Sequence, residues 1–139
     1  MKKALLFLHN NREVAFATSS QDSAGVSAPK IRVFQIMDMI GSDLYFATAA
    51  HKDVYRELQE NPNVELLVYK GNISVRITGK AIFDVSELQS KKIFSENPVL
   101  PRLYPSYDAM VYFRIPIAKI DYFDLEPTPP LFEHFEINS

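Results

Sequence analysis

Residues 73–83 have the sequence ISVRITGKAIF, in which every second residue from Ile73 to Phe83 is apolar or glycine. Successive side chains of a strand point to opposite faces, so this alternation predicts a strand with one buried face. The pattern is the longest of its kind in the chain. Gly71, just before it, predicts the turn that leads into this strand.

Shorter runs with a strand-like composition lie on both sides of this segment, and turn-forming residues separate them. Small and polar residues over 20–28 predict a turn, and Pro116 predicts an edge or a break between the last two strands. Together with 73–83, the expected strands are residues 13–19, 30–39, 43–48, 64–69, 109–115 and 120–125.

Helices are predicted in three places. A short amphipathic helix is expected at the N-terminus, and a second over 51–60, where Val54 and Leu58 lie on one side. A third begins with a capping-box pattern at Ser86 and extends to about residue 97. Seven short strands with flanking helices predict a mainly antiparallel β barrel or curled sheet, formed by one domain over residues 1–139.

Composition excludes several classes of function. The 139 residues carry 15 Lys and Arg against 17 Asp and Glu, so no basic surplus indicates nucleic-acid binding. The absence of cysteine excludes a thiolate metal site and a cysteine nucleophile. The four glycines are dispersed, whereas a phosphate loop or a dinucleotide fingerprint needs them close together.

The sequence has no segment that predicts membrane insertion or export. Its longest N-terminal apolar run is shorter than a secretory core, and no stretch approaches the about 20 apolar residues of a membrane span. A cytoplasmic protein is therefore expected.

The residues do not predict a complete catalytic group. His9, His51 and His134 are far apart in the sequence and lack the spacing of a metal site, so no metal is expected. No nucleophilic serine motif occurs either. We name no catalytic residue and expect a bound cofactor to supply any chemistry.

Three dispersed residues could together hold a phosphate monoester. Arg32 lies on an otherwise apolar strand face, Thr48 ends a strand where it could cap the next helix, and Lys52 lies in that helix's first turn. A cation at a helix start is unfavourable unless an anion lies nearby. The alternative is that Arg32 pairs with a carboxylate and Lys52 is solvated.

Five segments follow one another in a characteristic order and spacing: EVAFAT at 13–18, PKIRVF at 29–34, LYFAT at 44–48 with Lys52, LQENPNVE at 58–65 and VRITGKA at 75–81. With these segments the chain resembles the pyridoxamine 5′-phosphate oxidase-like family over about residues 12–126. The resemblance implies the FMN-binding split β-barrel fold and a flavin at the interface of a homodimer.

The resemblance also implies roles for individual residues. Arg32 would contact the FMN phosphate, and His51 and Lys52 would approach the same group. The remaining implied contacts lie along the flavin: the backbone of Val33 and Phe34 at the isoalloxazine, Ala47 and Thr48 near the ring and ribityl chain, and Ser74 in place of a longer family glutamine.

Two differences from the sequence of the oxidase argue against oxidation of pyridoxamine phosphate itself. Met37 stands where the oxidase has a lysine, and the tail lacks the oxidase's Arg-x-His pair. We therefore expect an FMN-dependent oxidoreductase that acts on an unidentified small molecule. In that case, replacing Arg32 and Lys52 with alanine should weaken FMN binding without changing the fold.

Two other functions fit the same sequence. One is a binding or carrier module for flavin, deazaflavin or haem that does no chemistry, and haem would take His9, His51 or His134 as its axial ligand. The other is a structural barrel that binds no ligand.

Overall fold

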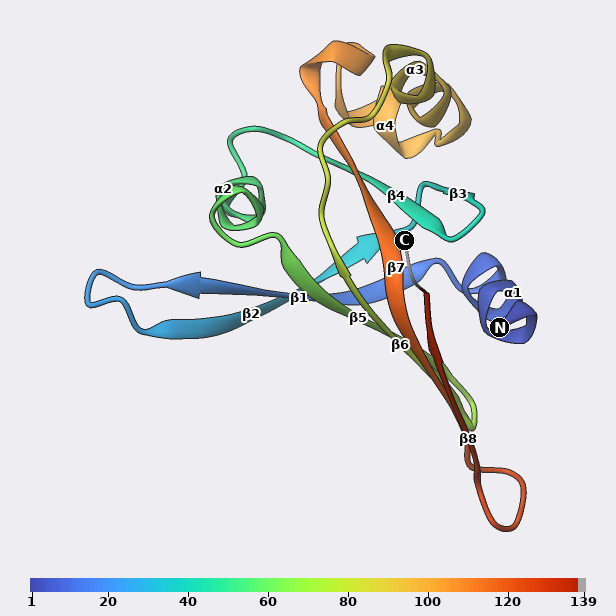
Figure 1. Ribbon diagram of the computed structural model, residues 1–139. Coiled ribbons are helices and arrows are strands. Elements are labelled where there is room, and N and C mark those ends of the chain that lie inside the picture. Colours follow the sequence, from blue (N-terminus) through green and yellow to red (C-terminus); the bar gives the residue numbers. More distant parts are fainter. Residues whose placement is uncertain (138–139) are drawn as a thin grey trace.

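The computed structural model describes residues 1–137, and its centre is a strongly curved sheet of eight strands (Figure 1). Every strand pairing is antiparallel, in the order β2-β1-β5-β6-β7-β4-β3, with β8 added beside β7. The mainly antiparallel fold class is confirmed. The strands are β1 (Glu13–Gln21), β2 (Ser27–Gln35), β3 (Asp38–Ile40), β4 (Asp43–Thr48), β5 (Asn63–Lys70), β6 (Ile73–Lys80), β7 (Val111–Asp124) and β8 (Leu131–Glu136).

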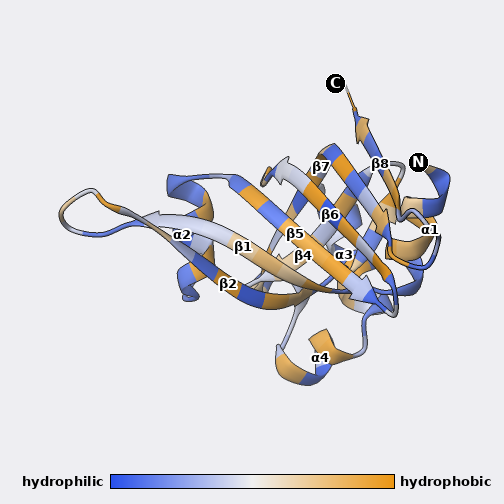
Figure 2. Cartoon of the chain, turned by 90° about the horizontal axis from the view of Figure 1, so that it is seen from below, coloured by the Kyte–Doolittle hydropathy of each residue, from blue (hydrophilic) through white to orange (hydrophobic). Residues whose placement is uncertain are grey.

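The predicted alternation is visible along β5 and β6, where apolar and polar residues follow one another (Figure 2). In β6, Val75, Ile77 and Gly79 are buried, as the pattern predicts. Gly79 is required by packing, because a Cβ atom there would lie 2.6 Å from Ile115 Cγ2 and 2.8 Å from the Pro116 carbonyl oxygen. The residue therefore allows β6 and β7 to approach closely at a register shift.

The expected strand over 30–39 is confirmed only as far as Gln35, because the chain leaves β2 there and continues as a separate strand, β3. Ile36 N–H still donates to the Arg12 carbonyl beside β1, but Met37 N–H donates to the Tyr45 carbonyl of β4. The backbone thus changes partners within two residues and continues as β3. β2 and β3 are the two ends of the strand order, and β3 pairs only with the first half of β4, so the barrel stays open between β2 and the rest of β4.

The expected break at Pro116 is also wrong, because β7 is continuous through it. Pro116 lies opposite Asp43 at the start of β4, and the next residue, Ile117, pairs with Gly79 of β6. The proline therefore stands where β7 changes neighbours, a position at which a missing backbone N–H costs no regular ladder bond.

The three expected helices are confirmed, and a further helical segment joins them. The Ser86 hydroxyl accepts a hydrogen bond from the Gln89 N–H at 3.1 Å, as the capping box predicts. α3 and α4 lie together at one end of the barrel, and α2 lies beside its open side (Figure 1). The helices are α1 (Lys2–Asn10), α2 (Asp53–Glu60), α3 (Glu87–Glu96) and α4 (Val99–Leu103), and a 3₁₀ turn, η1 (Tyr107–Ala109), follows them.

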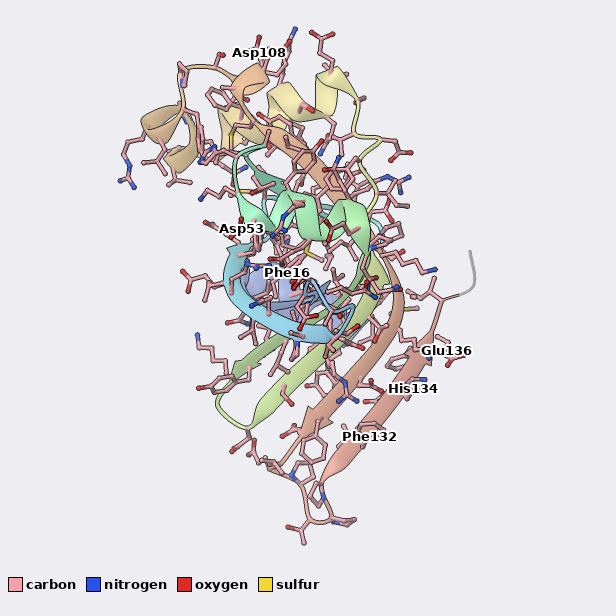
Figure 3. All side chains as sticks on the ribbon, turned by 90° about the vertical axis from the view of Figure 1, so that its left-hand side faces the viewer. Phe16, Asp53, Asp108, Phe132, His134 and Glu136 are labelled. Carbon is pink, nitrogen blue, oxygen red and sulfur yellow. The ribbon has the colours of Figure 1, made fainter. Side chains whose placement is uncertain are left out.

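Phenylalanine rings fill the interior of the barrel. Phe16, Phe46 and Phe113 are fully buried, and their ring centroids lie 5.5–6.1 Å apart. Phe34 of β2 packs on Phe16 at 4.7 Å. Phe16 lies inside the curve of the sheet below α2 (Figure 3). These rings hold β1, β2, β4 and β7 around one core although β2 and β4 do not pair.

Two hairpins extend away from this core (Figure 1). One joins β1 to β2, and the other joins β7 to β8, a strand that the sequence pattern did not predict. On β8, His134 bonds Asp121, which also pairs with Arg76 at 3.1 Å. Hydrogen bonds to Asp121 and Glu136 raise the pKa of His134. Within residues 1–137, no helix has the length and apolar character that a membrane crossing needs.

Candidate functional site

A cavity of about 530 Å³ occupies the open side of the barrel, between β2, β4, α2 and α4. Its volume lies within the range of small-molecule sites. Apolar side chains form most of its lining, with a few polar groups among them. The lining residues are Arg32, Val33, Phe34, Gln35, Met37, Ala47, Thr48, Lys52, Asp53, Val54, Val99, Leu100, Leu103, Tyr104 and Met110.

The free edge of β2 supplies backbone groups to this cavity. In an antiparallel pair, alternate residues bond the partner strand. The Ile36 N–H donates to the Arg12 carbonyl beside β1. Phe34 and Arg32 lie two and four residues before Ile36, so their backbone groups also point to β1. Val33 and Gln35 therefore direct theirs into the gap. An unpaired strand edge in a cavity can recognise a flat polar ring by hydrogen bonding.

Arg32 is held at one end of the cavity by two buried side chains. Its Nη2 lies 2.9 Å from Glu57 Oε1, and its Nη1 donates to Thr18 Oγ1 at 3.1 Å. The Thr18 hydroxyl donates in turn to the same Glu57 oxygen at 2.6 Å. Strand β2, strand β1 and helix α2 thus meet in one hydrogen-bonded triad. The alternative in which Arg32 pairs with a carboxylate is confirmed.

The triad keeps Glu57 ionised inside the protein. Burial alone raises the pKa of Glu57, but hydrogen bonds from Thr18 and Arg32 outweigh burial and hold the pKa below its ordinary value. Both Thr18 and Glu57 are buried. A buried carboxylate without its cation would be unfavourable in free energy. The ion pair therefore holds the Arg32 side chain in one orientation.

The contacts with Glu57 and Thr18 do not use all the N–H donors of the Arg32 guanidinium. The Arg32 side chain is 27% exposed and lines the cavity. Of its five N–H donors, the two bonds above use two, and the others are left for a ligand. Arginine suits this double role because its planar fork can bond a carboxylate on one side and a phosphate on another.

Lys52 also lines the cavity, at the N-terminus of α2. It is exposed, and it is the N-cap residue of the helix, which begins at Asp53. The prediction that Thr48 caps this helix is wrong, because the strand ends four residues before Lys52 and no side chain caps the helix. Thr48 is instead buried in the cavity wall.

The charges at this end of the cavity nearly cancel. Arg32 and Lys52 are opposed by Glu57 and by Asp53, which lies at the start of α2 (Figure 3). Asp53 is almost fully exposed, so water screens it, whereas the guanidinium is fixed and partly buried. Binding of an anion here therefore depends on directed N–H bonds rather than on a general positive field.

Six of the eight predicted site residues lie in the cavity wall: Arg32, Val33, Phe34, Ala47, Thr48 and Lys52. His51 lies in the exposed turn before α2 and does not line the cavity. Ser74 does not line it either. It lies on β6 opposite Tyr69, on the outer face of the sheet.

Sequence reasoning missed the second half of the site. Val99, Leu100 and Leu103 come from the short helix α4, Tyr104 follows that helix, and Met110 follows η1. Neither element has a periodic pattern long enough to predict it. Glu57 was also missed, although a glutamate beside the apolar stripe of α2 is a signal that could have indicated a buried partner for Arg32.

A family model described as pyridoxamine 5′-phosphate oxidase matches residues 1–121. The chain belongs to the pyridoxamine 5′-phosphate oxidase-like family. The family supports the interpretation of the curved sheet as the split barrel found in its FMN-binding members. No curated protein matches the sequence.

Solved structures with the same fold carry different names. A NimC/NimA family protein from Clostridium acetobutylicum is 22% identical, with a TM-score of 0.76 over 99% of this chain and 92% of the other. A pyridoxamine 5′-phosphate oxidase-related, FMN binding protein from Nostoc punctiforme is 16% identical, with a TM-score of 0.69 over 99% and 96%. A heme binding protein from Mycobacterium smegmatis is 9% identical, with a TM-score of 0.69 over 96% and 56%.

We predict that Arg32→Ala destabilises the protein, contrary to the expectation of an unchanged fold, because it leaves the buried Glu57 carboxylate unpaired. The loss of unfolding free energy at pH 7 should be about 3–5 kcal/mol. Urea unfolding monitored by circular dichroism measures it. Lys91→Ala is the control, since its ion pair with Glu87 is exposed on both sides and should contribute about 0–1 kcal/mol.

The loss of unfolding free energy in Arg32→Ala should also depend on pH. In the wild type the lowered pKa of Glu57 gives stability that is present above the unfolded value of about 4.3 and lost as pH falls through the folded value. In Arg32→Ala the bond from Thr18 remains but the cation is lost, so the pKa of Glu57 is higher than in the wild type and the carboxylate gives less stability above that pKa. The difference in unfolding free energy between the two proteins should therefore shrink as the pH falls from 7 to about 4. A pH-independent difference would contradict the role of this ion pair.

Proposed function

We propose that the protein binds FMN in the cavity between β2 and β4 and acts as a flavin-dependent oxidoreductase on a small molecule. The observation that carries the proposal is the arrangement of one cavity. Its lining includes two cations, Arg32 and Lys52, a free strand edge along one side, and mostly apolar side chains elsewhere. FMN has the matching parts, a phosphate, a polar edge of its ring and a largely apolar ring face.

The residues of the cavity fit this cofactor. Arg32 would donate its remaining N–H groups to the phosphate, and Lys52 would approach from the start of α2. Val33 and Gln35 would offer backbone N–H and C=O groups to the ring, beside Ala47 and Phe34. When bound, FMN would supply the electron or hydride transfer that no side chain of the site provides.

The lining favours flavin over haem. Among the described residues that line the cavity there is no histidine, whereas haem commonly takes one as its axial ligand. His51 lies outside the lining, His134 bonds Asp121 on β8, and His9 contacts Arg12 on the surface. Met37 lines the cavity where the oxidase has a lysine, which supports a substrate other than pyridoxamine phosphate.

We also propose that the protein forms a homodimer through the outer face of β1, β2 and β5. Ile31 and Val33 are 72% and 76% exposed on β2, and register places Ala15 and Leu67 beside Val33 on the same face. Such an exposed apolar patch on a sheet edge is typical of an association surface. Val33 also lines the cavity, so a second copy would border the flavin site.

Ser74 belongs to this proposal rather than to the cavity of its own chain. It lies opposite Tyr69, which is 75% exposed on the same outer face. In a two-fold dimer each copy presents this face to the other. The serine could therefore approach a flavin only in the assembled dimer.

We predict that Lys52→Gln weakens FMN binding about tenfold or more, because a charge-assisted hydrogen bond contributes about 1.5–3 kcal/mol. Lys52 is exposed, so its replacement should leave the unfolding free energy unchanged. Quenching of FMN fluorescence on titration with protein measures the affinity. Lys2→Gln, on the exposed side of α1, is the control and should bind as the wild type does. Equal affinity in both variants would refute the placement of the phosphate.

We predict that Ile31→Asp prevents dimer formation, because it places a charge within the apolar face. Light scattering after size exclusion should give twice the 15.9 kDa chain mass for the wild type and a single chain mass for the variant. Leu6→Asp, at an exposed apolar residue of α1, is the control and should remain dimeric. A monomeric wild type, or a dimeric Ile31→Asp, would exclude this interface.

A further inference from the structure

The two ends of the cavity differ in their chemistry. Within the described lining, the charged residues are Arg32, Lys52 and Asp53, and all three belong to β2 or to the start of α2. The opposite wall is apolar apart from one phenol. It consists of Val99, Leu100, Leu103 and Tyr104 of the α4 segment, with Met110 after η1 and Met37 after β2.

This apolar wall is fixed to the barrel by polar contacts that lie outside the cavity lining. The Asn97 side chain donates to the Met37 carbonyl at 3.2 Å and to the Ile93 carbonyl at 2.7 Å. Asp38 of β3 accepts from Gln89 at 2.8 Å and pairs with Lys92 of α3 at 2.9 Å. Gln89, Lys92 and Asn97 thus hold the helical segment to Asp38 and Met37, while apolar side chains of α4 line the cavity.

Leu103 shows that this wall is incompletely covered. The residue lines the cavity and is still 63% exposed. An apolar side chain at a cavity mouth gains free energy when an apolar ligand removes its surface from water. A charged ligand at the same place would lose hydration without meeting an opposite charge.

We infer that the substrate of the proposed flavin site is a neutral, planar aromatic molecule without phosphate, held against the α4 wall. The inference rests on the proposed function, because FMN would occupy the two cations, Arg32 and Lys52. A second phosphate or carboxylate would then find no free cation among the described lining residues. The apolar wall instead offers the flat contact that an aromatic ring needs.

Two naphthoquinones of similar shape test this inference. The FMN-loaded protein, in its oxidised form, is titrated with menadione, which is neutral, and with 1,4-naphthoquinone-2-sulfonate, which is anionic. Changes in the absorption spectrum of the bound flavin report binding. Menadione should bind at least tenfold more tightly than the sulfonate. Equal affinity, tighter binding of the sulfonate, or no binding of menadione would overturn the inference.

A positive charge on the apolar wall should shift the binding preference from menadione toward the sulfonate. With FMN at saturation in both proteins, Leu103→Lys should bind menadione about threefold more weakly or worse and the sulfonate more tightly. Leu88→Lys, on the exposed side of α3 and outside the cavity lining, is the matched control and should keep the wild-type preference. An unchanged preference in Leu103→Lys would overturn the placement on α4.

The proposed function and the proposed substrate class can be refuted separately. FMN binding is measured first, by fluorescence quenching with no quinone present, and a protein that does not bind FMN would refute the proposed function and this inference with it. A protein that binds FMN tightly but does not discriminate between the naphthoquinones would refute the substrate class alone.

Discussion

The ion pair between Arg32 and Glu57 is the interaction on which the site depends. Burial of the Glu57 carboxylate would be unfavourable alone, and the 2.9 Å contact to Arg32 with the 2.6 Å bond from Thr18 makes it possible. Because these residues belong to β2, α2 and β1, the pair fixes the helix to the edge of the sheet. It also fixes the guanidinium at one end of the cavity with donors left over for a ligand.

The cavity itself results from a change of strand partner. At Ile36 and Met37 the backbone passes from β1 to β4, so β2 ends with a free edge instead of closing the barrel. Buried phenylalanine rings hold the two sides together across the gap. The same opening provides unpaired backbone groups, a fixed guanidinium with free N–H donors and an exposed apolar face, which are the parts that a flavin site at a dimer interface needs.

The sequence predicted the regular parts of the fold well. Strict alternation predicted β6, and the capping box at Ser86 predicted α3, because both signals depend on local geometry alone. The break after Gln35 and the continuity of β7 through Pro116 were not predictable in this way. Both are changes of neighbour between distant strands, and local patterns carry no information about them.

The candidate site was predicted only in part. The resemblance to the family selected six residues that line the cavity, because they lie on β2, on β4 and at the start of α2, where strand pairing and the helix fix their positions. The α4 wall was missed because a five-residue helix has too few turns for a hydrophobic period. Glu57 was missed because pairing across 25 residues depends on the tertiary fold.

A comparison of FMN with riboflavin tests the central claim most directly. The two molecules share the ring and the ribityl chain and differ only in the phosphate, so isothermal titration of the wild-type protein with each isolates the contribution of Arg32 and Lys52. Two charge-assisted interactions predict that FMN binds at least about 100-fold more tightly than riboflavin at moderate salt. Affinities that agree within a few-fold would contradict the account, because the guanidinium would then serve Glu57 alone.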